Sequence, residues 1–277
     1  RERCCGGVDL RCLVEVRGAL RRCMSEGCDP SATCGELVAP SRCEKHFRKT
    51  AFLKSTDLGQ ALCCLAQRPD VRVALDMFLA EGDGSATMLA EGLSRNGGAL
   101  VSFERHAESF REAALWLAGL RGVRNVTSLP AVGAALARRL RGHLAAAAHR
   151  SGVSALLLLG VPVGPGRPSA LATLCGEAAV DLVYLDPGRG GVEAEVVELL
   201  SACRSLRFVV VNNLNLPQHA GWVREHLLGL GGEWAEVLSG RTLAVDKYIS
   251  EMPSGAASLY RSRGWSILAR TSATCDG

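Results

Sequence analysis

The stretch from residue 71 to residue 104 constrains the fold of this chain more than any other part. A β-branched apolar run ends at Asp76, and a loop of mostly small residues, FLAEGDGS, begins two residues later. After a helical stretch, a second apolar run ends at Glu104. This order of strand, glycine loop, helix, strand and acid is typical of the first unit of a nucleotide-binding α/β domain.

Three residues of the loop have the chemistry that such a unit needs, namely Gly82, Gly84 and Ser85. Glycine allows a tight turn where the strand meets the helix, so a ligand can approach the backbone. An acid at the tip of the second strand, here Glu104, can accept hydrogen bonds from the two hydroxyls of a ribose. We therefore interpret the rest of the chain as built around this unit.

The bulk properties exclude several classes of protein. A length of 277 residues suits one α/β domain with an extension, and a net charge of +4 gives no strong electrostatic attraction to nucleic acid. The arginines are spread along the chain, as in Arg138, Arg139 and Arg141, so we expect no nucleic-acid partner. The longest apolar run, 155–163, is interrupted by a glycine and a proline and is far shorter than the ~20 residues of a membrane-spanning helix.

Cysteine is frequent and unevenly distributed. Zinc, reduced buried thiols and disulfides all remain open, and we favour disulfides because a short segment with little core gains most from cross-links. Disulfides would place the protein in an oxidising or organellar compartment: a lumen, an intermembrane space or the exterior. Because the sequence begins with Arg, we expect that an N-terminal targeting segment has been removed. Seven of the twelve cysteines precede residue 44: Cys4, Cys5, Cys12, Cys23, Cys28, Cys34 and Cys43.

Two regions follow from these patterns. Residues 1–50 form a Cys-rich helical extension, in which 9–23 has a helical pattern with an apolar face that includes Val14, Val16 and Leu20, and residues 51–277 form an α/β domain. In this domain strands alternate with helices, which predicts a doubly wound, mostly parallel, seven-stranded sheet that ends in a hairpin. Two segments compete for the third strand, 125–128 and 155–163, and we favour the second because it is more apolar. The triplet Asn125-Val126-Thr127 also matches an N-glycosylation signal, a pattern that arises by chance as well.

Four segments together resemble a known family. They are LDMFLAEGDGSATMLAEGL, GGALVSFE, VDLVYLDPGRGG and VVVNNLNLPQHAGWVREHLL. In this order they look like the class I S-adenosylmethionine-dependent methyltransferases, and the nearest branch is the one similar to catechol O-methyltransferase. The resemblance covers roughly residues 55–271 and implies a Rossmann-like methyltransferase fold.

The resemblance implies roles for particular residues. Asp186 stands where the metal-dependent branch has its first metal-binding acid, and as a catalytic residue it would orient the acceptor. Asn212 and Asn213 occupy the place of that branch's Asp-Asn pair, which implies a divalent metal. Arg189 falls where the branch has a catalytic lysine. The residues implied to bind S-adenosylmethionine are Asp76, Gly82, Gly84, Ser85 and Glu104.

Three departures from the family pattern weaken the predicted activity. Phe78 replaces the first glycine of the loop, and its ring would project toward the methionine end of the cofactor. Asn212 removes a charge from the metal shell, whereas Mg²⁺ prefers charged oxygen ligands. Arg189 cannot act as a base because its guanidinium stays protonated.

Two functions from different classes are therefore predicted. One is an S-adenosylmethionine-dependent O-methyltransferase that acts on a small hydroxylated acceptor. The other is a catalytically degraded scaffold, a structural subunit of a larger organellar or membrane-associated complex with protein partners. A nicotinamide-dependent oxidoreductase is less favoured, because the LDPG and NNLNLP segments fit methyltransferases better. Each acid also has a structural interpretation, since Asp76 and Glu104 could cap strand ends and Asp186 could be a turn residue.

Overall fold

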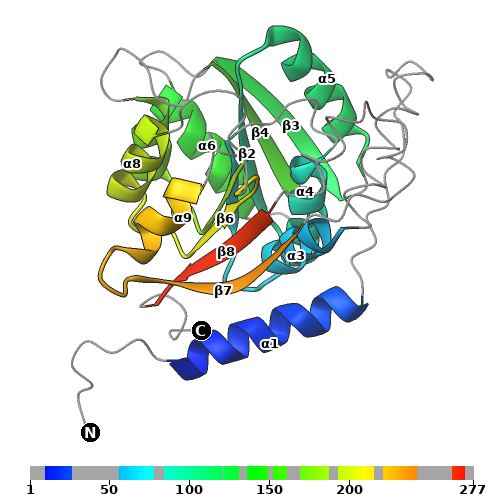
Figure 1. Cartoon of the computed structure of the whole chain (residues 1–277). Helices are drawn as coiled ribbons and strands as arrows, with labels where there is room; N and C mark the ends of the chain where they lie inside the picture. Colours follow the sequence, from blue (N-terminus) through cyan, green and yellow to red (C-terminus); the bar gives the residue numbers. More distant parts are fainter. Residues whose placement is uncertain are drawn as a thin grey trace, which may run out of the picture.

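The computed structural model of this chain describes residues 10–26, 56–77, 84–120, 122–130, 136–148, 152–160, 169–186, 193–214, 221–241 and 264–271. Strands and helices alternate along these residues, and the strands gather into a central sheet (Figure 1). The strands are β1 Val73–Asp76, β2 Gly98–Glu104, β3 Val123–Pro130, β4 Val153–Leu159, β5 Leu182–Leu185, β6 Phe208–Val211, β7 Trp234–Arg241 and β8 Gly264–Arg270. The helices are α1 Leu10–Glu26, α3 Asp57–Ala66, α4 Ser85–Asn96, α5 Ala107–Ala118, α6 Leu136–Ala148, α7 Ala170–Glu177, α8 Glu193–Ala202 and α9 Gly221–Leu228.

The sheet has eight strands in the order β3-β4-β2-β1-β5-β6-β8-β7. Pairing is parallel from β3 to β6, and β8 then pairs antiparallel with both β6 and β7. The predicted doubly wound, mostly parallel sheet with a terminal hairpin is confirmed. The strand number is eight rather than seven, because both candidates for the third strand form strands: 125–128 lies within β3 and 155–159 within β4.

Two apolar layers cover the two faces of the sheet. One layer packs α3, α4 and α5 against alternate residues of the central strands, such as Ala74, Leu100 and Leu182. The other layer packs α6 to α9 against the intervening residues, such as Leu75 and Val183. Because successive side chains of a strand point to opposite faces, an apolar run covered on both sides must be apolar throughout, as these strands are.

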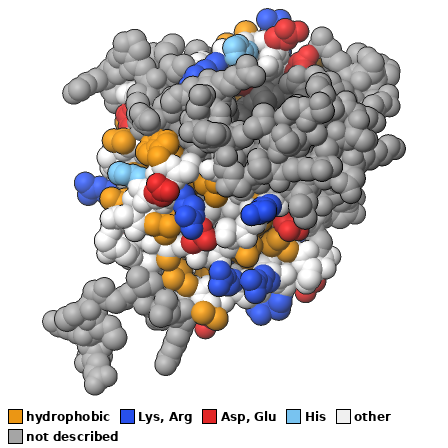
Figure 2. Space-filling view, viewed as in Figure 1, with side chains coloured by type: hydrophobic (Ala, Val, Ile, Leu, Met, Phe, Trp, Pro, Cys, Tyr) orange, Lys and Arg blue, Asp and Glu red, His pale blue; other side chains and the backbone are white. Residues whose placement is uncertain are grey.

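Helix α1 lies outside the sheet layers, below α3 and β7 in Figure 1. Val16 and Leu20 are buried against the domain, as the helical pattern predicts, and the Arg17 guanidinium donates a 2.7 Å hydrogen bond to the carbonyl of Val237. Val14, which we expected on the same apolar face, is 67% exposed, because it lies on the outer side of the helix. The described side chains on this side of the molecule mix basic, acidic and apolar types (Figure 2).

Two disulfides join described cysteines. Cys23 of α1 is bonded to Cys64 of α3, with 5.8 Å between their Cα atoms, so the N-terminal helix is cross-linked to the domain. Cys175 at α7 is bonded to Cys203, just after α8, with 4.8 Å between Cα atoms. The second bond lies inside the α/β domain rather than in the Cys-rich segment. Among the helices that the structure describes, none is both long and apolar enough to cross a membrane.

Candidate functional site

Polar side chains gather where the parallel strands end. Ser102 of β2 is in register with Asp76 of β1, and Asp76 is in register with Tyr184 of β5. Residues in register on parallel strands share a face of the sheet, so these three side chains form a row at the carboxyl edge. All three are buried, and the strand residues just before them, Leu75, Val101 and Val183, are apolar. In open α/β sheets this edge is where ligands bind.

Asp76 is fully buried and is held by the helix that follows the glycine loop. The hydroxyl of Ser85, the first residue of α4, donates to Asp76 Oδ2 at 2.8 Å. Gly84 precedes the helix, and its carbonyl accepts from the backbone N–H groups of Thr87 and Met88. The structure thus brings Asp76 and Ser85 together, as the resemblance implied. Gly82 and Phe78 lie outside the described residues.

Glu104 ends β2 and is 7% exposed. Its Oε1 accepts a 2.7 Å hydrogen bond from the backbone N–H of His106, which precedes α5. This contact fixes the direction of the carboxylate, while Oε2 has no hydrogen-bond partner among the described residues. Glu104 therefore makes the strand-end contact that its structural interpretation predicts, and the described residues leave Oε2 without a donor.

Asp186, which follows β5, is surrounded by hydrogen-bond donors. The hydroxyl of Tyr184 donates to Asp186 Oδ2 at 3.2 Å, and the amide nitrogen of Asn212 lies at the same distance from this oxygen. The amide of Asn213 donates to the other oxygen, Oδ1. Asn213 has a φ of 61°, a left-handed conformation that asparagine tolerates better than most residues. The structure therefore brings the three predicted residues together.

Tyr184 connects this cluster to the first one. Its side chain is buried, and burial raises the pKa of the phenol well above its usual range. The negative charges of Asp186 and Asp76 raise the pKa further. The phenol therefore stays protonated at physiological pH and acts as a neutral donor to Asp186.

The Asp186 cluster does not fit a divalent metal. The atoms that Asn212 and Asn213 direct at Asp186 are amide nitrogens, which donate hydrogen bonds and cannot ligate a cation. Mg²⁺ prefers several oxygen ligands with carboxylate charge, and this cluster offers one carboxylate. Within the described ranges, no three His, Cys, Asp or Glu side chains gather as metal ligands would. Arg189 lies outside those ranges.

The first cluster does fit a nucleoside-type cofactor. Ser102 is fully buried between Asp76 and Glu104 in the sheet edge, yet its hydroxyl has no partner in the part of the chain that the structure describes. A buried hydroxyl without a partner costs free energy, so such groups often mark a ligand site. The pattern of residues could have revealed Ser102 and Tyr184, because each is a polar residue two positions before the acid at the end of its apolar run.

A cavity of about 480 Å³ lies farther along the same edge, between α9 and the β7–β8 hairpin. Leu214, the residue after Asn213, lines it together with the ion pair of Arg224 and Glu236, whose closest atoms are 2.6 Å apart. The hydroxyls of Ser239 and Ser266 also donate to Glu236. Burial opposes the charge of Glu236, but these donors and Arg224 outweigh it, and the pKa of Glu236 is lowered. Sequence patterns did not indicate this cavity, because its wall comes from four separate segments: residue 214, α9, β7 and β8.

Sheet order, register and the antiparallel terminal hairpin define a Rossmann-like α/β domain. No family model matches the chain, and a search of curated proteins found no match. Solved structures similar to it include S-adenosylmethionine-dependent O-methyltransferases. TomG of Streptomyces achromogenes, an O-methyltransferase involved in tomaymycin synthesis and solved with SAM, is 19% identical; the match covers 85% of this chain and 92% of that one, with a TM-score of 0.46.

Two further solved structures are similar over most of the chain. The O-methyltransferase of Bacillus cereus in complex with SAH is 16% identical, with 85% of this chain and 93% of that chain covered and a TM-score of 0.45. The SAH-bound methyltransferase PaMTH1 of Podospora anserina is 14% identical, with 92% and 95% covered and a TM-score of 0.43. At these identities the likeness concerns the fold.

Proposed function

We propose that this protein binds S-adenosylmethionine at the carboxyl edge of β1 and β2 and transfers its methyl group to an oxygen of a small hydroxylated acceptor. The observation that supports this most is the arrangement of acids on adjacent strands. Asp76 is buried and held by Ser85 at the start of α4, and Glu104 keeps one carboxylate oxygen available. Between them lies the hydroxyl of Ser102, which has no partner among the described residues.

Each residue has a distinct part in this proposal. Glu104 Oε2 accepts hydrogen bonds from the ribose hydroxyls, and the Ser102 hydroxyl provides a further buried contact. Asp76 and Ser85 fix the start of α4 beneath the cofactor. When bound, the cofactor supplies a methyl sulfonium, an electrophile that needs little more from the protein than in-line positioning of the acceptor oxygen.

Asp186 orients the acceptor in this proposal, without a metal. Its two oxygens are already aligned by Tyr184, Asn212 and Asn213, and a carboxylate oxygen has capacity for more than one donor. A hydroxyl of the acceptor can therefore donate to Asp186 without displacing the amides. This arrangement limits the acceptor to molecules small enough to reach the strand ends.

A second candidate is a catalytically degraded scaffold within a larger complex. The specific observation in its favour is that three neighbouring side chains already donate to Asp186, which satisfies this carboxylate without any ligand. Such a cluster can hold the end of β5 to the end of β6 as a purely structural contact. Protein partners would then be the ligands of the domain.

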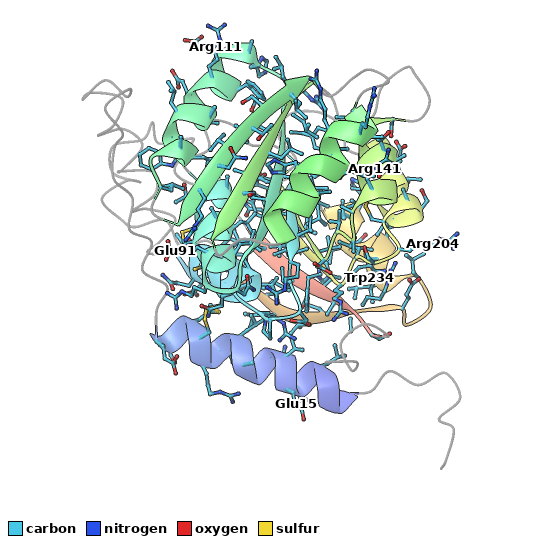
Figure 3. The ribbon with its side chains drawn as sticks, turned by 180° about the vertical axis from the view of Figure 1, so that it is seen from behind. Glu15, Glu91, Arg111, Arg141, Arg204 and Trp234 are labelled. Atoms are coloured by element: carbon cyan, nitrogen blue, oxygen red, sulfur yellow. A yellow bond between two sulfur atoms is a disulfide. The ribbon has the colours of Figure 1, made fainter. Side chains whose placement is uncertain are left out.

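Calorimetric titration with S-adenosylmethionine and S-adenosylhomocysteine distinguishes the two. Micromolar binding that is weakened by Glu104→Gln supports the proposed cofactor site. Absence of binding to the wild-type chain, together with binding after Phe78→Gly, supports the scaffold with a blocked cofactor site. The variant Glu15→Gln, at an exposed position on α1 that points away from the domain (Figure 3), is a matched control.

A further inference from the structure

One of the two edge strands of the sheet holds the one Asn-X-Ser/Thr triplet of the sequence, Asn125-Val126-Thr127. This strand, β3, pairs with β4 on one side and is the end of the strand order on the other. Figure 1 shows β3 along the rim of the domain, beyond β4. The side chain of Asn125 is exposed, whereas Val126 between the two polar residues is partly buried in the core.

Local geometry presents the asparagine amide outward. Asn125 and Thr127 project from the same face of the strand, and Asn125 Nδ2 donates to Thr127 Oγ1 at 3.2 Å in a solvent-exposed hydrogen bond. The register with β4 shifts between Val123 and Asn125, so the strand is irregular just before the triplet. The Asn and Thr groups of the signal are thus adjacent, and the reactive nitrogen is at the surface.

A second, independent observation concerns the compartment. Cys23–Cys64 and Cys175–Cys203 are disulfides, and each joins two separate helical regions of the protein. Disulfides form and persist in secretory and other oxidising compartments and are rare in the cytosol. The secretory route is also where an asparagine in an Asn-X-Ser/Thr triplet meets the glycosylation machinery.

We propose that Asn125 carries an N-linked oligosaccharide. In the transfer, Asn125 Nδ2 forms a bond to the anomeric carbon of the first sugar of a polyprenyl-diphosphate oligosaccharide. The bond from that carbon to the diphosphate oxygen breaks, the diphosphate leaves with the electron pair, and the amide loses one proton. No oxidant or reductant is consumed.

The position of Asn125 leaves the candidate cofactor site open. Asn125 pairs with Ser154 near the start of β4, whereas Glu104 pairs with Leu159 at its end. These two partner residues are five positions apart along β4, which corresponds to roughly 16 Å. The glycan and the cofactor site are therefore at different ends of the sheet, and this proposal is independent of the proposed function.

The glycan would also protect the edge of the sheet. An exposed edge strand offers unpaired N–H and C=O groups to other chains, and proteins commonly block such edges with charge or bulk. On β3 the adjacent residues Arg124 and Asn125 are both exposed, so a glycan on Asn125 adds bulk beside an existing charge. Loss of the glycan is thus expected to promote self-association through β3.

The test is a peptide map of the full chain purified from the cells that naturally produce it. After treatment with an N-glycosidase in heavy-oxygen water, the peptide that contains Asn125 should carry an oxygen-labelled aspartate at position 125. Without the enzyme, the unmodified peptide should be a minor species. An unmodified Asn125 peptide as the main species overturns the proposal.

Three variants, secreted from a eukaryotic host, test the geometry. Asn125→Gln and Thr127→Ala should each remove one discrete glycan increment from the intact mass, whereas Thr127→Ser, which preserves the signal, should keep it. The secreted Asn125→Gln chain should also show more dimer and larger species in light scattering. A glycan increment that persists in Asn125→Gln, or a secreted wild-type chain without one, contradicts the assignment.

Discussion

Ser85 donates its hydroxyl hydrogen to the carboxylate of Asp76, with Oγ and Oδ2 2.8 Å apart. The bond joins the end of β1 to the first residue of α4, so it fixes where the helix begins relative to the sheet. Asp76 is fully buried, and a buried carboxylate requires donors to offset its desolvation. This contact therefore links the stability of the domain to the geometry of the candidate cofactor site.

The variant Ser85→Ala should lower both stability and cofactor affinity. Removing one donor from a buried carboxylate is expected to cost about 1–3 kcal/mol in the free energy of unfolding. Urea unfolding measures this loss, and calorimetry with S-adenosylhomocysteine measures the affinity. Ser94→Ala is the control, because Ser94 lies on the same helix and donates only to the carbonyl of Glu91. If Ser85→Ala and Ser94→Ala changed stability and affinity equally, the hydrogen bond from Ser85 to Asp76 would not have the proposed role.

Glu104→Gln should weaken cofactor binding with little effect on folding. The glutamine carbonyl can still accept from the backbone N–H of His106, so the end of β2 keeps its contact. Hydrogen bonds to a charged acceptor contribute about 1.5–3 kcal/mol, so Kd should rise roughly ten- to hundredfold. Thermal unfolding should stay within a few degrees of wild type. An unchanged Kd in Glu104→Gln would mean that Glu104 does not bind the ribose hydroxyls of the cofactor.

Asn212→Asp should create a metal dependence that the wild-type chain lacks. A second carboxylate beside Asp186 introduces like-charge repulsion and removes an amide donor, which is expected to destabilise the protein by about 1–3 kcal/mol at neutral pH. Millimolar Mg²⁺ should restore most of this loss, because two carboxylates can share a divalent cation. Wild-type protein should show the same melting temperature with Mg²⁺ and with a chelator. A chelator-sensitive wild type would mean that Asp186 does bind metal.

His143 should make the protein less stable as the pH falls below about 6.5. The side chain is buried on α6, and burial lowers its pKa despite a hydrogen bond to the backbone of Ser154. The unfolded chain therefore binds a proton at a higher pH than the folded chain, and the free energy of unfolding decreases as the pH falls. Urea midpoints between pH 8 and pH 5 measure this slope. His143→Gln should flatten it, and an unchanged slope in this variant would contradict the role of His143.

Replacing both Cys23 and Cys64 by Ala should release α1 from the domain. For a sequence separation of 41 residues, the loss of loop constraint corresponds to about 4 kcal/mol. Limited trypsin digestion should then cut faster at Arg21 and Arg22, which are exposed on α1. The matched double variant of Cys175 and Cys203 should lower stability without this change in α1. If trypsin cut α1 equally slowly in both double variants, packing alone would hold α1 against the domain.

Local patterns predicted most of the elements. The apolar run that ends at Asp76 and the one that ends at Glu104 are both strands, because neither contains a residue that interrupts a buried strand. Thr56 caps α3, with its side-chain oxygen accepting a 3.1 Å hydrogen bond from the backbone N–H of Gly59, and a threonine followed by an acid is a common helix start. The late hairpin of β7 and β8 was also predicted correctly.

Other features could not be predicted, for physical reasons. Periodicity could not decide between 125–128 and 155–163 as the third strand, because a sheet can accept both when a helix covers the connection. Disulfide pairing depends on which cysteines the fold brings together, and the partner of Cys23 is 41 residues away. Val14 fits an apolar stripe in the sequence, but only the packing of α1 shows that it faces outward.

The sequence by itself determined the class of fold and the order of its acids, because strand and helix periods and glycine turns are short-range properties. Only the tertiary structure decided what those acids contact. Asp76 accepts a hydrogen bond from Ser85, Glu104 accepts one from the backbone of His106, and Asp186 accepts amide donors from residues 26 and 27 positions away. Long-range strand pairing creates these contacts, so the chemistry of the edge depends on register as well as on composition.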